Sequence, residues 1–99
     1  MGLFNAWSSI NQINGLLKDL ENQVAISQGQ VERNAPKSNL INSLNVHNRI
    51  HQELINAFSG SGGARVAVYT LFGEKVKMDD ILTYSKNLIC NLNSIIKSI

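Results

Sequence analysis

The chain has 99 residues, of which 43% are hydrophobic and 16% are charged, and its formal net charge is +2. This length suits one small domain with a modest core, and the apolar fraction is too high for a disordered chain. The net charge is too small to indicate a nucleic acid as partner, and no apolar run approaches the roughly eighteen residues of a membrane span.

The first element is predicted as a long helix over about residues 4–33. Its apolar residues alternate at spacings of three and four, which is the heptad pattern of a helix that packs against another helix. These seam positions are Leu3, Ala6, Ile10, Ile13, Leu17, Leu20, Val24, Ser27 and Val31, with Ser27 as the single polar member. The sequence Asn34-Ala35-Pro36 should end this helix, because proline disfavours helical geometry in the residue before it.

A second helix is predicted over about residues 37–59. Its apolar arc is wide, which suits a helix that contacts two neighbours rather than one. Two polar residues, His47 and His51, fall near the centre of this arc. The Gly/Ser segment from Ser59 to Gly63 should stop the helix and form a flexible loop.

Residues 60–77 are predicted to hold the loop and a short β-hairpin. The stretch from Val66 to Leu71 is rich in β-forming residues, Phe72-Gly73 has the character of a turn, and Lys75 to Lys77 can form the returning strand. An isolated two-stranded ribbon is marginal in water, so we expect it to pack on the helices or on a partner.

The last helix is predicted over about residues 79–98, with Asp79 as its N-cap and Asp80 in the first turn. We place the single cysteine, Cys90, beside the apolar face of this helix and expect a buried structural thiol. The whole chain, residues 1–99, is thus predicted to be one mainly α domain. It is a three-helix bundle with a hairpin-like insertion before the last helix.

The two histidines, spaced by four residues, allow three interpretations. They could bind zinc, but a third ligand is missing unless Cys90 or Glu53 supplies it. They could form a pH-sensitive seam, because buried histidines titrate near neutrality. The interpretation we prefer is that His47 and His51 hydrogen-bond to the first or last helix and set the register of packing. We therefore expect no metal and no cofactor.

The first seventeen residues carry no charged side chain. Because the first helix should be longer than the other two, part of its seam is expected to be left uncovered, and exposed apolar surface of this kind marks an interface. We expect a homodimer or partner complex with Leu3, Phe4, Trp7 and Ile10 at the contact. The alternative is that this helix lies on a membrane surface.

The helical seams and the absence of catalytic motifs together predict the class of function. We expect a non-enzymatic protein-binding protein (an adaptor, inhibitor or assembly factor) that acts through helix packing, because no nucleophile–base pair, cofactor motif or small-molecule site is evident. A third reading is nucleic-acid binding through the basic hairpin residues Arg65, Lys75 and Lys77. A lone cysteine and the absence of a signal-peptide pattern favour a cytoplasmic location, and the abundance of asparagine and isoleucine hints at an AT-rich bacterial or phage genome.

Overall fold

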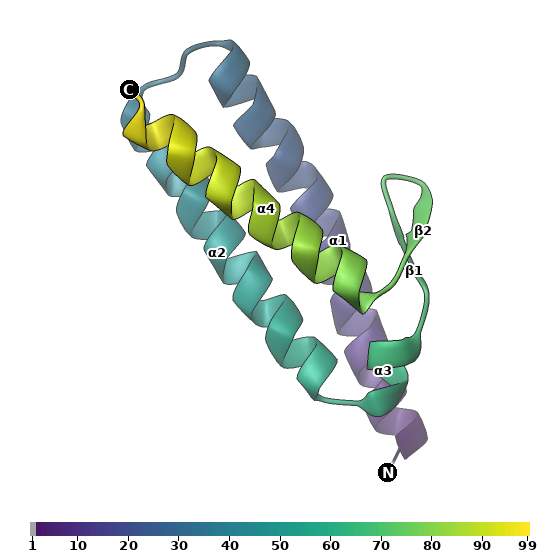
Figure 1. The fold of residues 1–99 in the computed structure, drawn as a ribbon. Coiled ribbons are helices and arrows are strands. Elements are labelled where there is room, and N and C mark those ends of the chain that lie inside the picture. Colours follow the sequence, from purple (N-terminus) through teal and green to yellow (C-terminus); the bar gives the residue numbers. More distant parts are fainter. Residues whose placement is uncertain (1) are drawn as a thin grey trace.

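The structure is a computed structural model. It describes the backbone of residues 2–99 and the side chains of residues 6–99. Three long helices run side by side, and a short helix and a two-stranded hairpin lie between the second and the last (Figure 1). The elements in chain order are α1 Gly2–Glu32, α2 Lys37–Ser59, α3 Gly62–Val66, β1 Tyr69–Leu71, β2 Glu74–Val76 and α4 Met78–Lys97. The prediction of a mainly α bundle with a hairpin before the last helix is confirmed.

The helix α1 ends where the sequence predicts. Asn34 adopts the left-handed conformation, with φ 52°. The backbone amides of Asn34 and Ala35 bond back to the carbonyls of Val31 and Gln30, which satisfies the last turn of the helix. Pro36 is then the N-cap residue of α2, and α2 runs antiparallel to α1 (Figure 1).

The helix α3 was not predicted, since its residues were expected to belong to the Gly/Ser loop and to the start of the β-like segment, in which Val66 was counted as a β-former. It is one turn long and its sequence, Gly-Gly-Ala-Arg-Val, has little helical preference. It forms because the Ser61 hydroxyl accepts the backbone amide of Gly63 as an N-cap and because Ala64 is fully buried. A Cβ atom on Gly63 would lie 2.9 Å from that of Ala6, so glycine lets α3 approach α1 closely.

The hairpin packs through one face. Tyr69 and Leu71 are buried and Thr70 between them is exposed, which is the alternation of a half-covered strand. The strands are antiparallel, with Tyr69 opposite Val76 and Leu71 opposite Glu74. The Tyr69 ring meets Phe58 edge to face at 5.7 Å, and its hydroxyl donates to the carbonyl of Ala64. The hairpin is thereby fixed to α2 and α3.

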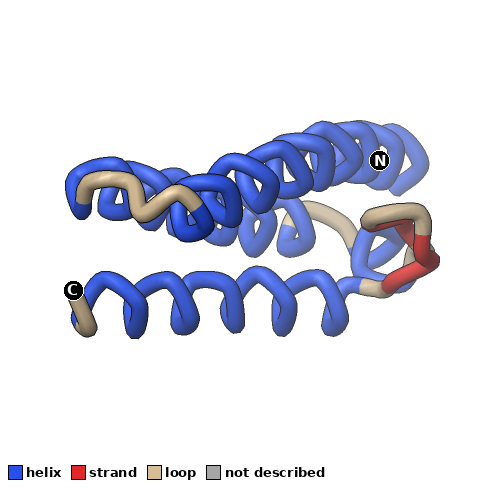
Figure 2. The backbone as a smooth tube through the Cα atoms, turned by 90° about the horizontal axis from the view of Figure 1, so that it is seen from above, coloured by secondary structure: helices blue, strands red, loops and turns tan. Residues whose placement is uncertain are grey.

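The helix α4 begins one residue earlier than predicted, and its cap differs. Lys77 is the N-cap residue, and the carboxylate of Asp80 accepts its backbone amide at 3.2 Å. Asp79, expected at the cap, instead lies in the first turn, where its charge suits the helix dipole. From there α4 runs along α2 toward the α1–α2 loop, parallel to α1 (Figures 1 and 2).

The core has two apolar clusters. The larger one joins the N-terminal two thirds of α1 to α2, α3, β1 and the start of α4. The smaller one holds Leu40, Leu92 and Ile96 near the α1–α2 loop. Between them lies a layer of buried polar residues, which is where the histidines are found.

Candidate functional site

The buried polar layer is centred on His47, whose side chain is 1% exposed. Its Nε2 lies 3.0 Å from the Ser27 hydroxyl of α1. That hydroxyl lies 2.7 Å from the carbonyl of Gln23 and can donate its one hydrogen there, which leaves it free to accept a hydrogen from His47. On this ground we assign His47 as the Nε2–H tautomer; its Nδ1 has no hydrogen-bond partner among the described residues.

Further polar contacts join α1 to α2 beside this pair. The amide of Gln23 donates to the hydroxyl of Ser43 at 3.0 Å, and Ser43 donates to the side-chain oxygen of Gln30 at 2.6 Å. Every hydrogen bond in this chain of contacts has a consistent donor and acceptor. Such a layer defines one register of α1 on α2, because a shift of either helix would leave buried polar groups unpaired.

The second histidine contacts the other neighbouring helix. The Nδ1 of His51 lies 3.0 Å from the hydroxyl of Ser85 on α4, and Ser85 is fully buried. Burial lowers the pKa of both histidines, and the nearby charge of Lys86 adds to this effect at His51. Each histidine thus forms a hydrogen bond across the seam, His47 to α1 and His51 to α4, and burial favours the neutral form of both rings.

The surroundings of the histidines can be compared with what a metal site and a catalytic serine would require. A metal site would need three ligands that converge, and no such group of His, Cys, Asp or Glu occurs in the described part of the chain. Glu53, one third ligand considered from the sequence, pairs with Arg49 at 3.3 Å. A serine nucleophile would need to give its hydrogen to the histidine, whereas Ser27 gives it to a backbone carbonyl.

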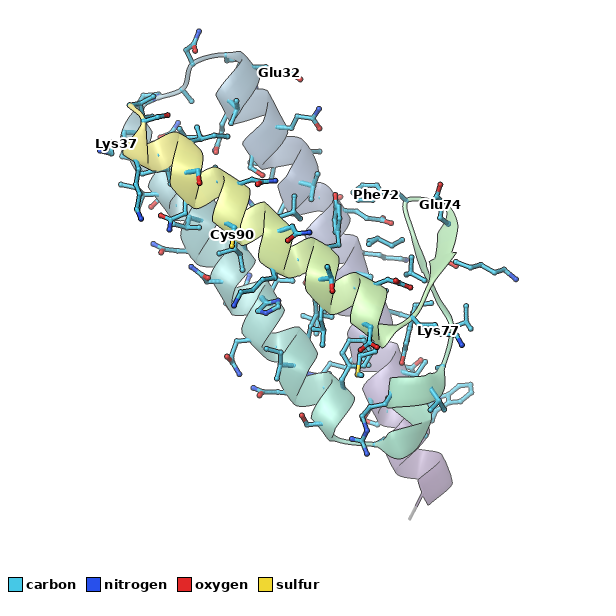
Figure 3. The ribbon with its side chains drawn as sticks, viewed as in Figure 1. Glu32, Lys37, Phe72, Glu74, Lys77 and Cys90 are labelled. Atoms are coloured by element: carbon cyan, nitrogen blue, oxygen red, sulfur yellow. The ribbon has the colours of Figure 1, made fainter. Side chains whose placement is uncertain are left out.

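Cys90 is not buried, and the expectation of a structural thiol is wrong. It lies exposed on α4 (Figure 3). At roughly 100° per residue, nine residues place it on the opposite side of the helix from Ile81, which is fully buried.

A groove lies beside the histidine layer, between the last third of α1 and α4. Its cavity measures about 280 Å³, and His47 forms part of its lining. One wall is made by Val24 and Val31 of α1 and the other by Leu88 and Ile95 of α4. Both apolar pairs are seven residues apart, so the walls have the spacing of a helical seam that lacks a neighbour. A second cavity of about 260 Å³ shares Val31 and Ile95 and extends the groove toward the α1–α2 loop.

The groove is open because the hairpin covers only the earlier part of the same face of α1. Thr70 lines a cavity with Leu17 and Glu21 of α1. The hairpin then turns back where the carboxylate of Glu21 accepts the backbone amide of Phe72 at 2.7 Å. Beyond Glu21 that face continues as Val24 and Val31, which line the groove: Val24 is half-buried against the core, and Val31 is 37% exposed. The sequence did not reveal the groove, because it depends on where the hairpin lies.

The tip of the hairpin stands next to this groove. Phe72 is 51% exposed and meets the ring of Tyr84, a groove residue, edge to face at 6.1 Å (Figure 3). Its φ of 51° is left-handed, which is unfavourable for a bulky side chain. Together with φ 80° at Gly73, it is the geometry of a two-residue type I′ turn, and this turn places the Phe72 ring at the hairpin end of the groove.

The N-terminal end of α1 carries the other candidate surface. Trp7 is 67% exposed, and Val66 and Val68, in and just after the neighbouring α3, are 74% and 56% exposed. Ile10 differs from the expectation, because it is half-buried and packs against the chain's own core. The side chains of Leu3 and Phe4 lie outside the described residues.

One of the residues proposed from the sequence for nucleic-acid contact, Arg65, is engaged within the fold, and so is Tyr69, the aromatic residue of β1. The Arg65 guanidinium donates to the carbonyl of Phe58 at 3.1 Å, and Tyr69 is buried, so its ring cannot stack on a base. Lys75 and Lys77 remain exposed on and next to β2. The hairpin is thus a weaker candidate than the groove or the Trp7 end.

Comparison of the chain with protein-family models, with curated proteins and with solved structures gave no match. Among the described residues, no helix is both long and apolar enough to cross a lipid bilayer.

Proposed function

We propose that this chain is a small non-enzymatic protein-binding protein that acts through helix packing and self-associates through the Trp7 end of α1. The observation that carries the proposal is the exposure of Trp7, two thirds of whose surface faces solvent. A tryptophan buries about 200 Å² when covered. At about 25 cal/mol per Å², its exposure forgoes about 3 kcal/mol that a partner would supply.

The neighbourhood of Trp7 supports a protein contact. Val66 and Val68 add exposed apolar surface at the same end of the bundle. The first seventeen residues have no charged side chain that a partner would have to desolvate. An adaptor, inhibitor or assembly factor would use such a surface, and self-association is the commonest way for one chain to bury it.

Sedimentation equilibrium at tens of micromolar tests the proposal. The wild type should exceed the monomer mass, and Trp7→Asp should reduce it to the monomer while the far-ultraviolet circular dichroism stays helical. Ile26→Asp is the matched control, because Ile26 is 50% exposed on the same helix but lies outside the Trp7 end and the groove. A monomeric wild type would refute self-association.

A membrane surface is the second candidate, favoured by the same exposed tryptophan on an uncharged stretch of helix. Trp7 is the one tryptophan of the chain, so its fluorescence reports on this site alone. Co-sedimentation with lipid vesicles and a blue shift of the emission would support this reading. A blue shift that follows protein concentration without lipid would support self-association instead.

A further inference from the structure

The Trp7 end and the α1–α4 groove lie at opposite ends of one rigid helix. Trp7 and Val24 are 17 residues apart, a distance of about 25 Å along a helix that rises 1.5 Å per residue. A chain cannot therefore place its own Trp7 in its own groove. Both surfaces are open in a single copy, so an occupant of either one would come from another molecule.

The two surfaces match in chemistry. The groove walls are apolar, and the polar residues at its edge are the neutral amides Gln28 and Asn91, with no charged side chain among its described lining residues. The N-terminal stretch that carries Trp7 is also uncharged. Insertion of one into the other would bury no unpaired charge, and an amide oxygen at the edge can accept the indole N–H.

The size of the groove also suits this occupant. Its cavity of about 280 Å³ lies just below the roughly 300 Å³ at which pockets begin to hold whole small molecules, and it can receive one aromatic ring. At one end the exposed ring of Phe72 stands beside Tyr84, so an incoming indole would find aromatic neighbours.

We propose that the α1–α4 groove of one copy receives the Trp7 end of α1 from a second copy. This inference rests on the proposed self-association and states which surface Trp7 binds. The contact joins two different patches, so it is heterologous, and it leaves a free groove on one copy and a free Trp7 on the other.

The directions in which the Trp7 end and the groove face determine whether two copies form a closed dimer or an open chain. At roughly 100° per residue, 17 residues rotate the Trp7 direction by about 100° from that of Val24 around the axis of α1. Two copies that each inserted Trp7 into the other would need both patches on one side of the molecule. The geometry instead favours open head-to-tail chains, whose mean mass rises steadily with concentration.

Complementation between two variants tests the inference. Trp7→Asp keeps the groove but loses its occupant, whereas Val31→Asp keeps the occupant but places a charge in the groove wall. Val31 is 37% exposed, so the fold should tolerate the change. Asn91→Glu, at the exposed groove edge, replaces it if circular dichroism shows Val31→Asp to be unfolded, and Ile26→Asp serves as control.

We expect each groove or Trp7 variant alone to sediment as a monomer, and their equimolar mixture to form a complex of two chains that grows no further. A groove variant that associates like the wild type would overturn the inference while leaving the proposed self-association intact. A mixture that stays monomeric, although each variant is folded, would also overturn it, because it indicates a symmetric contact. A monomeric wild type would refute both proposals.

Discussion

Ser27 and His47 face each other across the α1–α2 interface, with 3.0 Å between the serine hydroxyl and Nε2. Ser27 is the polar break in the heptad of α1, and His47 is the fully buried polar residue of the α2 arc. The two departures from an apolar seam thus satisfy each other. Because Nε2 already carries a hydrogen, a second proton on Nδ1 would create a buried cation without an acceptor.

Acid should therefore destabilise the fold before the carboxylates titrate. Burial lowers the pKa of His47 and His51 below their ordinary value of 6.5 in the folded chain, so the unfolded chain binds protons more readily. The free energy of unfolding should be constant above this value and fall as the pH drops below it. The slope can reach about 1.4 kcal/mol per pH unit for each histidine. Urea unfolding between about pH 8 and about pH 5 measures it.

The matched variants His47→Gln and His51→Gln assign the effect. An amide can replace each ring's hydrogen bond to serine but cannot titrate. Each variant should flatten the pH dependence by its own share. If the double variant kept the full slope of the wild type, groups other than the histidines would be responsible.

The helices could be predicted because their signals are local and repeated. The heptad of α1, the stop at Asn34 to Pro36 and the β-formers around Phe72-Gly73 each specify structure through neighbouring residues. The α3 turn could not be predicted, because it depends on Ala64 and Gly63 packing against α1, a contact between segments more than fifty residues apart.

The candidate site was only partly visible in the sequence. The histidines stood out as polar residues in an apolar arc, and Ser27 as a break in the heptad, so their pairing could have been proposed from those two irregularities. The groove could not, since it exists where the hairpin stops short on α1. Cys90 was misplaced because it is adjacent to Ile89, which the sequence placed in the widened seam, whereas the buried face of α4 is centred on Ile81, Leu92 and Ile96.

Two glycines should respond to alanine in opposite directions. Neither Gly15 nor Gly73 has an atom within 4 Å of the position of a new Cβ, so packing does not contribute. Gly15 lies at an exposed position inside α1, and alanine there should stabilise by about 0.5–1 kcal/mol. Gly73 has φ +80°, and alanine there should cost about 1–2 kcal/mol. Each kcal/mol corresponds to about 4–8 °C in Tm for a domain of this size. Equal shifts in Tm for the two variants would contradict the turn geometry.

The exposed position of Cys90 predicts ready modification of the folded chain. A maleimide should label the thiol completely under native conditions, at nearly the rate seen for the urea-unfolded chain. Cys90→Ser should leave the Tm unchanged, because the side chain fills no space in the core. Labelling that required unfolding would instead support the buried thiol expected from the sequence.

Removing Ser27 and removing His47 should change the free energy of unfolding by unequal amounts. Ser27→Ala leaves the buried Nε2–H of His47 unpaired and should lower the free energy of unfolding by about 1–3 kcal/mol. His47→Leu should be nearly neutral or stabilising, because Ser27 keeps its bond to the Gln23 carbonyl and the unpaired Nδ1 is removed.

The double variant measures the coupling between the two residues. In the His47→Leu background, Ser27→Ala should cost less than about 1 kcal/mol, since no buried donor is left without a partner. Urea unfolding of the four chains at neutral pH provides the cycle. If Ser27→Ala had the same cost in both backgrounds, the hydroxyl would act through Gln23 alone and His47 would not be its partner. A cost confined to the chain that retains His47 would establish that Ser27 stabilises the fold through its contact with His47, one of the polar contacts that join α1 to α2.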